Sequence, residues 1–310
     1  MKIVFLDAAT VIDEVTAPIF SKLENLTLYD STKPEEVFER IKDVDVIITN
    51  KVYIGKEQID SDPNLKLICV AATGMNNVDL KYAGQKGIPV RNAVNYSTDS
   101  VAQVTFMQIL NLVGKSAAFD DYCKSGKYSA SGCFTTISIP FYNLKGKRLG
   151  IVGLGNIGSK VAEIAATFGM EVAYYATSGI AHSDKYPALS LDELLSESDI
   201  VSVHAPLNER TDNLIDYSQI SKMKPSAFLL NMGRGGIVNE IDLAVALDEG
   251  LIAGAAVDVY TKEPIPAGHP YLSMAHPERL LMTPHIAWAS NQARVSLAEK
   301  IVDNINQTLK

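Results

Sequence analysis

A glycine-rich turn near the middle of the chain has the residue types and spacing to bind a phosphate group. The turn reads Gly153-Leu154-Gly155-Asn156-Ile157-Gly158, after an apolar run and before a helical pattern. In that setting the first glycine makes a tight turn, the second lets the backbone approach a pyrophosphate, and the third lets the helix pack closely on the strand. The following helix would also direct its N-terminus at the phosphate charge. The pattern predicts a dinucleotide-binding turn; the alternative is a glycine-rich connection that holds no ligand.

The residues about twenty positions after this turn bear on which dinucleotide fits. An acidic residue there would hold the adenosine ribose hydroxyls and repel a 2′-phosphate, yet the stretch Tyr175-Ala176-Thr177-Ser178 contains none. Thr177 and Ser178 offer hydroxyl donors, but no arginine stands nearby in the sequence to pair with a phosphate. NADH and NADPH therefore both remain possible cofactors. NADH is favoured because the missing acidic residue only removes a repulsion of the 2′-phosphate, whereas tight binding of NADPH would need a positive charge that attracts it.

Three further segments each follow an apolar, strand-like run and carry one reactive side chain, namely Arg234, Glu263 and His285. The carboxyl ends of parallel strands meet at one edge of a sheet, so we expect these side chains to converge beside the cofactor. A guanidinium can bind the carboxylate and carbonyl of a 2-oxo acid in a bidentate manner. A histidine can supply the proton that the carbonyl oxygen needs when hydride reaches its carbon, and a neighbouring carboxylate fixes the histidine tautomer. The trio predicts reversible reduction of a 2-oxo acid.

Each of these residues also has a structural interpretation. A lone histidine is more often structural than catalytic, and His285 differs from the others because Pro284 and the apolar run 280–282 place it after a strand. Lys262 and Glu263 alone would be an exposed charge pair. Trp288 is explained as well by core or dimer packing as by substrate contact. The sequence has no cluster of His, Cys and Asp with ligand spacing, so no metal site is predicted.

Composition and charge exclude several classes of protein. With 310 residues, 47% hydrophobic and 21% charged, the chain is long enough for two domains with sizeable cores. Its net charge of −8, without a Lys/Arg-rich run, argues against nucleic acid and anionic membranes as partners. Apolar stretches fall far short of the roughly 18 residues of a membrane helix, and the N-terminal apolar run is too short for a signal peptide. The three cysteines are an odd number without metal-ligand spacing, and we interpret them as reduced thiols. The chain is therefore predicted to be cytoplasmic.

Short runs rich in Val, Ile and Leu alternate with helical patterns, which is typical of α/β domains with parallel sheets. The candidate strands of the first series are 2–6, 44–49, 67–70 and 89–91. Those of the second series are 147–152, 171–175, 200–204, 227–231 and 255–259. A long helix is expected from Ser100 to about Lys124 as a bridge between domains. A final amphipathic helix, 291–310, is expected to pack back on the first domain.

The chain resembles the D-2-hydroxyacid dehydrogenase family over essentially its whole length. The segments that carry the resemblance are 72–79, 96–102, the Gly153 turn, His204-Ala205-Pro206-Leu207 and the segments of Arg234, Glu263 and His285. Trp288 after His285, together with Tyr96-Ser97-Thr98-Asp99, is most similar to the glycerate dehydrogenases, also called hydroxypyruvate reductases. Gln103 and Val104 stand where many relatives have Glu and His, a departure that bears on local packing rather than on chemistry.

The resemblance implies two Rossmann-like or flavodoxin-like parallel-sheet domains, with a cofactor domain, 99–284, inserted in a substrate domain, 1–98 plus 285–310. It implies that Arg234 holds the substrate carboxylate and carbonyl oxygen, that His285 exchanges the proton and that Glu263 pairs with His285. A homodimer built mainly on the cofactor domain is also implied. The residues expected at the cofactor are Gly153, Gly155, Asn156, Ile157, Gly158, Ala176, Thr177, His204, Ala205, Pro206, Met232 and Asp258. Those expected at the substrate, besides Arg234 and His285, are Thr73, Gly74 and Trp288.

The expected reaction is reduction of hydroxypyruvate or glyoxylate to D-glycerate or glycolate. Two alternatives remain open. One is a dinucleotide-sensing interaction protein, similar to the corepressors of this family, against which the retained Arg, Glu and His argue. The other is a dehydrogenase of 3-phosphoglycerate, which would need basic residues near 73–79, where there are none.

Overall fold

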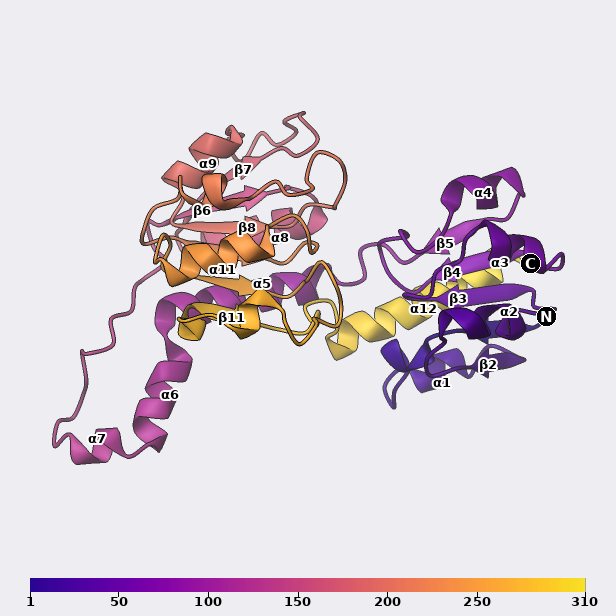
Figure 1. Ribbon diagram of the computed structural model, residues 1–310, viewed down its shortest axis with the longest axis horizontal. Coiled ribbons are helices and arrows are strands. Elements are labelled where there is room, and N and C mark those ends of the chain that lie inside the picture. Colours follow the sequence, from indigo (N-terminus) through magenta and orange to yellow (C-terminus); the bar gives the residue numbers. More distant parts are fainter. Residues whose placement is uncertain (310) are drawn as a thin grey trace. The chain divides into compact units, whose positions relative to one another are not determined.

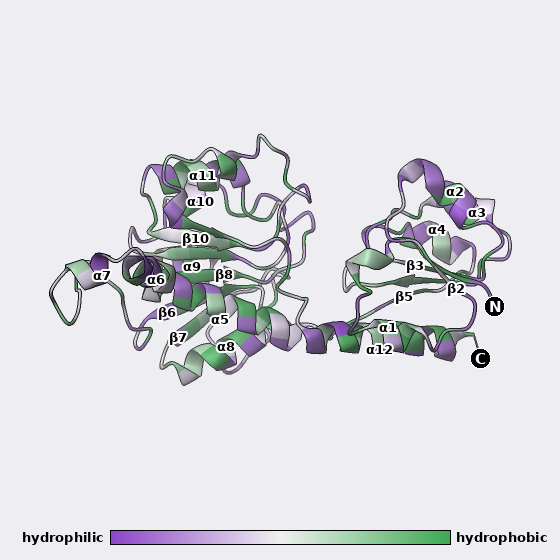
Figure 2. Cartoon of the chain, turned by 90° about the horizontal axis from the view of Figure 1, so that it is seen from below, coloured by the Kyte–Doolittle hydropathy of each residue, from purple (hydrophilic) through white to green (hydrophobic). Residues whose placement is uncertain are grey.

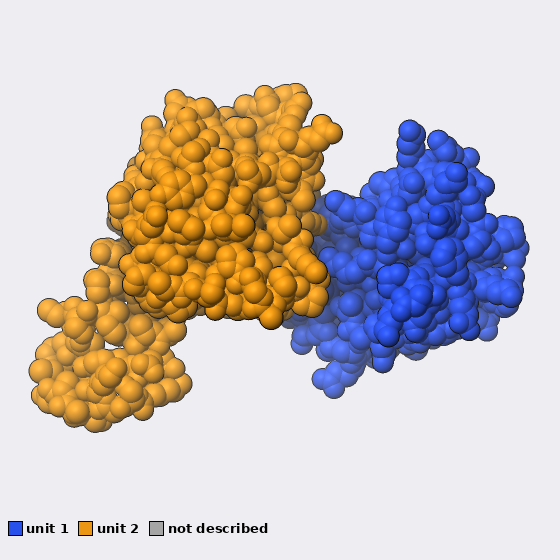
Figure 3. All heavy atoms as spheres, viewed as in Figure 1, with its two compact units in different colours: residues 1–97, 288–310 blue, residues 98–287 orange. Residues whose placement is uncertain are grey.

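Two parallel β-sheets organise the chain, which the computed structural model describes over residues 1–309 (Figure 1). Unit 1 consists of residues 1–97 and 288–310, and unit 2 consists of residues 98–287 (Figure 3). Unit 2 is therefore inserted between the two parts of unit 1. Figure 2 shows that in each unit hydrophobic strands lie between layers of helices.

The sheet of unit 1 has the strand order β2-β1-β3-β4-β5, and every neighbouring pair is parallel. Its strands are β1 (Ile3–Phe5), β2 (Leu26–Leu28), β3 (Val46–Thr49), β4 (Leu67–Val70) and β5 (Val90–Asn92). Because side chains alternate along a strand, Ile3 and Phe5 join one hydrophobic cluster, whereas Val4 joins the cluster on the other face. Each cluster packs a different set of helices against one face of the sheet.

The first cluster of unit 1 contains side chains from α1 and α12, and the second contains side chains from α2, α3 and α4. The helices of unit 1 are α1 (Ala17–Phe20), α2 (Val37–Arg40), α3 (Lys56–Ser61), α4 (Leu80–Gln85) and α12 (Asn291–Thr308), with 3-10 turns at Ala8–Thr10 and Pro34–Glu36. The expected packing of the C-terminal helix on the first domain is confirmed, since Leu297 and Ile301 of α12 are fully buried in the first cluster. Lys310, the last residue of that prediction, lies outside the described residues.

The sheet of unit 2 has the strand order β11-β10-β9-β8-β6-β7, again with parallel neighbours throughout. Its strands are β6 (Arg148–Val152), β7 (Glu171–Tyr175), β8 (Ile200–Val203), β9 (Phe228–Asn231), β10 (Gly254–Val257) and β11 (Leu280–Met282). Strand β6 lies between β7 and β8, so the chain reverses its direction of winding there. A ligand crevice is expected at such a point, above the carboxyl ends of the strands.

Helices cover both faces of this sheet. They are α5 (Thr98–Gly114), α6 (Ser116–Lys124), α7 (Lys127–Ala130), α8 (Asn156–Thr167), α9 (Leu191–Glu197), α10 (Tyr217–Ile220) and α11 (Glu240–Asp248), with 3-10 turns at Pro270–Leu272 and Pro277–Arg279. Helices α9, α10 and α11 share one hydrophobic cluster with the strands, and α5 and α8 pack against each other on the opposite face (Figure 2).

The helix predicted from Ser100 to Lys124 as a bridge between domains is wrong in its continuity. The helix is interrupted at Lys115, whose φ of 53° is left-handed and separates α5 from α6. Helix α5 begins where the chain enters unit 2, and within that unit the ring of Phe106 stacks on Phe168 at 5.5 Å between centroids. From there α6 and α7 extend away from the sheet of unit 2 as an arm (Figure 1).

The segment around His285 belongs to unit 2, although the predicted boundary at 284/285 assigned it to the substrate domain. Ile286 and Ala287 donate their backbone N–H groups to the Asp258 carboxylate at 2.9 Å each, which ties the segment to the end of β10. Across residues 1–309, none of the helices combines the length and apolar character needed to cross a membrane.

Candidate active site

The glycine-rich turn connects β6 to α8, and its three glycines meet three different environments. Gly153 adopts a φ of 92°, where a side chain would be strained, and a Cβ there would lie 3.0 Å from the Ala205 backbone. At Gly155 a Cβ would meet no atom within 4 Å, whereas at Gly158 it would lie 2.3 Å from the Gly153 carbonyl oxygen. The turn therefore has open space at its second glycine and close helix–strand contact at its third, which is the cradle that a dinucleotide pyrophosphate requires.

Asn156 and Ile157 begin α8 directly after this cradle, Asn156 exposed and Ile157 half-buried. The imidazole Nε2 of His182 lies 2.8 Å from the Leu154 carbonyl oxygen. This contact ties the segment after β7 to the glycine turn, and no local sequence pattern indicates it.

His285 and Glu263 form a contact pair at the carboxyl edge of the sheet. The Nδ1 atom of His285 lies 2.8 Å from Oε2 of Glu263, and both side chains are about one-quarter exposed. The other carboxylate oxygen, Oε1, accepts the Tyr260 backbone N–H at 3.1 Å. A carboxylate at Nδ1 keeps the proton on that nitrogen and leaves Nε2 as the nitrogen that can exchange a proton.

The Asp258 carboxylate accepts hydrogen bonds from the backbone segment that contains His285. This carboxylate is 1% exposed, and its two oxygens accept the Thr283 hydroxyl at 2.6 Å and the two amides after His285. Burial raises the pKa of Asp258, against the opposing effect of these hydrogen bonds. His285 itself has a φ of 54°, a strained conformation for a residue with a side chain, which persists only where the surroundings impose it. The structure thus gives Asp258 a positioning contact that the sequence did not suggest.

Arg234 lies in the loop after β9, which packs tightly on the loop that carries Glu263. A Cβ at Gly235 would lie 2.0 Å from the Tyr260 carbonyl carbon, so the two backbones are in direct contact at that glycine. The Arg234 carbonyl accepts the Asn231 side-chain amide at 3.0 Å, and its guanidinium donates to the Gly233 carbonyl at 2.8 Å. Among residues 1–309 no carboxylate lies within ion-pair distance of this exposed guanidinium. Tyr260 thus joins the Arg234 loop to the His285–Glu263 pair.

The third strand end in this region carries His204, Ala205 and Pro206, directly after β8. Burial lowers the pKa of His204 to about 3, so its ring is neutral, and its Nε2 lies 2.9 Å from the Ser202 hydroxyl. The Ala205 backbone is in contact range of both Gly153 and Gly233, so it lies between the glycine turn and the Arg234 loop. Met232 is 5% exposed and donates its N–H to Val203 at 3.2 Å.

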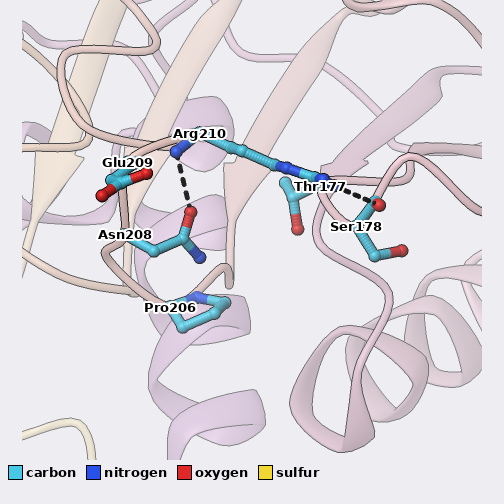
Figure 4. A pocket seen from close by; sticks show the side chains of 6 residues that line it. All are labelled: Thr177, Ser178, Pro206, Asn208, Glu209 and Arg210. Atoms are coloured by element: carbon cyan, nitrogen blue, oxygen red, sulfur yellow. Dashed lines mark hydrogen bonds between the residues drawn. The ribbon is translucent and has the colours of Figure 1, made fainter.

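A pocket of about 630 Å³ lies beside the end of β7 (Figure 4). It is lined by Thr177, Ser178, Pro206, Asn208, Glu209 and Arg210. The Arg210 guanidinium donates to the Ser178 carbonyl at 2.5 Å. No arginine stands near this strand end in the sequence, but the fold supplies one: Arg210 follows Ser178 by 32 positions and reaches it from the loop after β8. Only a fold in which β7 and β8 flank β6 brings the two segments together.

Thr73, Gly74 and Trp288 lie in unit 1. The Thr73 hydroxyl donates to the Ala93 carbonyl at 3.0 Å, and its own carbonyl accepts the Asn92 side-chain amide at 2.6 Å. Trp288 packs edge-on against Tyr96 at 6.1 Å between ring centroids, next to the core of unit 1. Their contact with substrate stays a prediction. In the part of the chain that the structure describes, no three His, Cys, Asp or Glu side chains gather as metal ligands would.

Comparison with known proteins bears on the identity of this site. Residues 106–287 match the family described as "D-isomer specific 2-hydroxyacid dehydrogenase, NAD binding domain". The chain is 36% identical to a hydroxypyruvate reductase of Blautia hydrogenotrophica, over 91% of this chain and 88% of that protein. It is 35% identical to a glycerate dehydrogenase of Methylorubrum extorquens, over 98% of this chain and 95% of that protein.

Solved structures agree over nearly the whole length. An acyclic imino acid reductase in complex with NADPH and D-Arg has a TM-score of 0.87 and 27% identity, covering 100% of this chain and 97% of its own. A D-lactate dehydrogenase from Aquifex aeolicus, complexed with NAD and lactic acid, has a TM-score of 0.84 and 28% identity, covering 98% and 94%. The chain therefore belongs to the D-isomer specific 2-hydroxyacid dehydrogenase family of NAD-dependent oxidoreductases.

Proposed function

We propose that this chain reduces hydroxypyruvate or glyoxylate, giving D-glycerate or glycolate, with NADH or NADPH as the hydride donor. The observation that carries the proposal is the 2.8 Å contact between His285 Nδ1 and Glu263, on the same sheet edge as Arg234. The relatives named hydroxypyruvate reductase and glycerate dehydrogenase support this choice of substrate. All of these compounds are small 2-oxo or 2-hydroxy acids.

The residues of unit 2 would divide the chemistry among them. The glycine turn would hold the dinucleotide, which would supply the hydride. Nε2 of His285 gives a proton to the carbonyl oxygen during reduction and takes it back during oxidation. Glu263 keeps the ring in the required tautomer and stabilises the imidazolium. Arg234 binds the substrate carboxylate and polarises its carbonyl oxygen through two parallel hydrogen bonds.

The remaining predicted residues complete the proposal. Thr73 and Gly74 supply backbone groups for the substrate carboxylate, and Trp288 contacts the substrate. Around the dinucleotide, the proposed set is Gly153, Gly155, Asn156, Ile157, Gly158, Ala176, Thr177, His204, Ala205, Pro206, Met232 and Asp258.

A spectrophotometric assay of NADH and NADPH oxidation tests this function directly. Hydroxypyruvate, glyoxylate, pyruvate, phenylpyruvate and 3-phosphohydroxypyruvate are compared at matched concentrations. We expect the highest kcat/KM with hydroxypyruvate or glyoxylate. Tight dinucleotide binding without turnover of any 2-oxo acid would support the sensing protein instead, and a preference for the phosphorylated acid would support the 3-phosphoglycerate dehydrogenase.

Two glycine substitutions should separate stability from binding at the same turn. Gly158→Ala places a methyl group 2.3 Å from a carbonyl oxygen, so we expect the free energy of unfolding to fall by about 1–3 kcal/mol. Gly155→Ala meets no atom within 4 Å and should unfold at the wild-type temperature, but it fills the space for the pyrophosphate and should weaken NADH binding. Thermal unfolding and fluorescence titration with NADH measure the two effects. Equal NADH affinity in Gly155→Ala and wild type would contradict the assignment of the cradle.

We also propose that the chain is a cytoplasmic homodimer joined through the arm of unit 2. The arm consists of α6, α7 and the segment 131–141 that follows them, and this segment exposes large apolar side chains, with Phe134 and Ile137 each 92% exposed and Phe141 60% exposed. Apolar side chains that a single chain leaves so fully in water are typical of an interaction surface. All three cysteines are free thiols, as is usual in a reducing compartment.

The double variant Phe134→Asp, Ile137→Asp should convert the dimer to a monomer. Light scattering should then give a mass near 33.6 kDa in place of about twice that value. The matched control is Leu28→Asp, Phe38→Asp, which changes two exposed apolar residues of unit 1 by the same chemistry. A dimer that survives the arm substitutions would place the interface elsewhere.

A further inference from the structure

We infer that the pocket beside β7 is a site for the 2′-phosphate of NADPH, and that Arg210 makes this chain prefer NADPH to NADH. The inference rests on the proposed function, because it concerns the adenosine end of the dinucleotide held at the glycine turn. The sequence alone favours NADH and leaves NADPH open, and the inference concerns which of the two this chain binds more tightly.

The first step is the absence of a carboxylate where the ribose would be held. Strand β7 ends at Tyr175, and Ala176 occupies the position at which an acidic residue would bind the ribose hydroxyls and repel a phosphate. Ala176 begins a turn that is closed by the Gly179 N–H, which donates to the Ala176 carbonyl at 2.8 Å. Gly179 has a φ of 79°, which a residue with a side chain rarely adopts. The turn presents Thr177 and Ser178 to the pocket.

The second step is the presence of a cation that the fold brings to this turn. Figure 4 shows the Arg210 side chain crossing the pocket toward Thr177 and Ser178, with Glu209 at the other end of the arginine. One N–H of the guanidinium is bound to the Ser178 carbonyl, and a guanidinium has five N–H donors. No carboxylate of residues 1–309 forms an ion pair with Arg210, so its charge has not been neutralised within the chain.

The third step is that the loop of Arg210 is already ordered. The Arg210 backbone N–H donates to the Asn208 side chain at 2.9 Å. Thr211, which is fully buried, donates its hydroxyl to the Pro206 carbonyl at 2.6 Å and accepts the Asn208 N–H at 2.9 Å. A ligand that binds Arg210 therefore loses little binding free energy to the ordering of this loop.

The ligand chemistry follows from what surrounds the pocket. The Arg210 guanidinium and the hydroxyls of Thr177 and Ser178 line the pocket, and no carboxylate stands at the strand end, a combination that suits a phosphate dianion. The Ser178 hydroxyl also donates to the Ile180 carbonyl at 3.2 Å, and the one carboxylate that lines the pocket, Glu209, lies at the other end of the arginine. The 2′-phosphate is the only group that distinguishes NADPH from NADH, and it lies on the adenosine ribose. The donors of this pocket would form hydrogen bonds with the 2′-phosphate of NADPH. In NADH a hydroxyl takes its place, and the donors would have no anion to bind.

Binding measurements test the inference without turnover. Adenosine 2′,5′-bisphosphate and 5′-AMP differ only by the 2′-phosphate, and we expect the wild-type chain to bind the first about tenfold or more tightly. The advantage should shrink as NaCl rises, because the contact is ionic and partly exposed. In Arg210→Gln the Kd of NADPH should rise about tenfold or more beyond any rise in the Kd of NADH. Lys145→Gln is the matched control, since it removes one exposed positive charge just before the amino end of β6.

The same measurements separate the inference from its rivals. If Arg210 only stacks on the adenine ring, Arg210→Gln weakens NADH and NADPH equally and the inference is overturned. If wild type binds 5′-AMP as tightly as the bisphosphate, it is also overturned, although 2-oxo acid reduction with NADH would still support the proposed function. If the bisphosphate binds tightly but no 2-oxo acid is reduced, the proposed function fails and the phosphate site stands.

A variant that should discriminate against NADPH provides a second test, and it leaves Arg210 in place. Ala176→Asp restores a carboxylate at the end of β7, where it would accept hydrogen bonds from the ribose hydroxyls and repel the phosphate. We expect the ratio of the NADPH Kd to the NADH Kd to rise at least as far as in Arg210→Gln. An unchanged ratio in a folded Ala176→Asp protein would place the ribose elsewhere and overturn the inference.

Discussion

His285→Ala is expected to lower kcat for reduction of hydroxypyruvate by about 10²- to 10⁴-fold, the usual contribution of a general acid. The Kd of the dinucleotide should stay close to that of wild type, because the glycine turn is formed by β6 and α8 and does not include the His285 segment. Steady-state kinetics and fluorescence titration on the same preparation measure the two quantities. The split between them is the signature of a group that acts on the reacting carbonyl.

His276→Ala is the matched control for this prediction. His276 also pairs with a glutamate, since its Nδ1 lies 3.2 Å from Glu278, but the pair is exposed and follows no strand end. Its loss should leave kcat unchanged, as expected of a solvent-exposed side-chain contact. Retention of more than a tenth of the wild-type kcat by His285→Ala would reject the proton-exchange role.

Much of the parallel-sheet core could be predicted from the sequence because buried parallel strands are continuous apolar runs. Strands β4 and β7 match the predicted ranges 67–70 and 171–175 residue for residue. Strand β2 was missed, since Leu26–Leu28 is an edge strand whose residues are mostly exposed and therefore lack that run. The break between α5 and α6 was missed because it depends on the left-handed backbone of Lys115, a residue type with no preference for that conformation.

The candidate site also contains residues that could be predicted from the sequence and contacts that could not. Each predicted catalytic side chain follows its own strand, and local pattern is sufficient to place it at the sheet edge. The contacts of Asp258 with Thr283 and the amides after His285 join positions 25 to 29 residues apart, and no local pattern encodes them. Arg210 is a comparable case: its loop gives no signal in sequence, and its partner Ser178 follows a different strand.

Arg234→Gln is expected to lower kcat/KM for 2-oxo acids by about 10²- to 10³-fold, with a rise in KM, because one side chain both binds the carboxylate and polarises the carbonyl. The loop holds the arginine in place through the Asn231 amide and through the contact of Gly235 with Tyr260, so a substitution of the side chain should leave the loop intact. Affinity for oxamate, a mimic of a 2-oxo acid, should fall in parallel. Lys145→Gln again controls for the loss of one positive charge.

Arg234→Lys discriminates between charge and geometry at the same position. A lysine keeps the positive charge but is a point charge, and it cannot form two parallel hydrogen bonds to a planar carboxylate. If bidentate binding is required, Arg234→Lys should retain less than about a tenth of the wild-type kcat/KM. If it instead stays within threefold of wild type, a point charge is sufficient, and the fork of the guanidinium is not what selects a 2-oxo acid. Arg234 makes no ion pair within residues 1–309, and a lysine can also donate to the Gly233 carbonyl that the guanidinium contacts. The comparison of arginine with lysine therefore reports on the substrate.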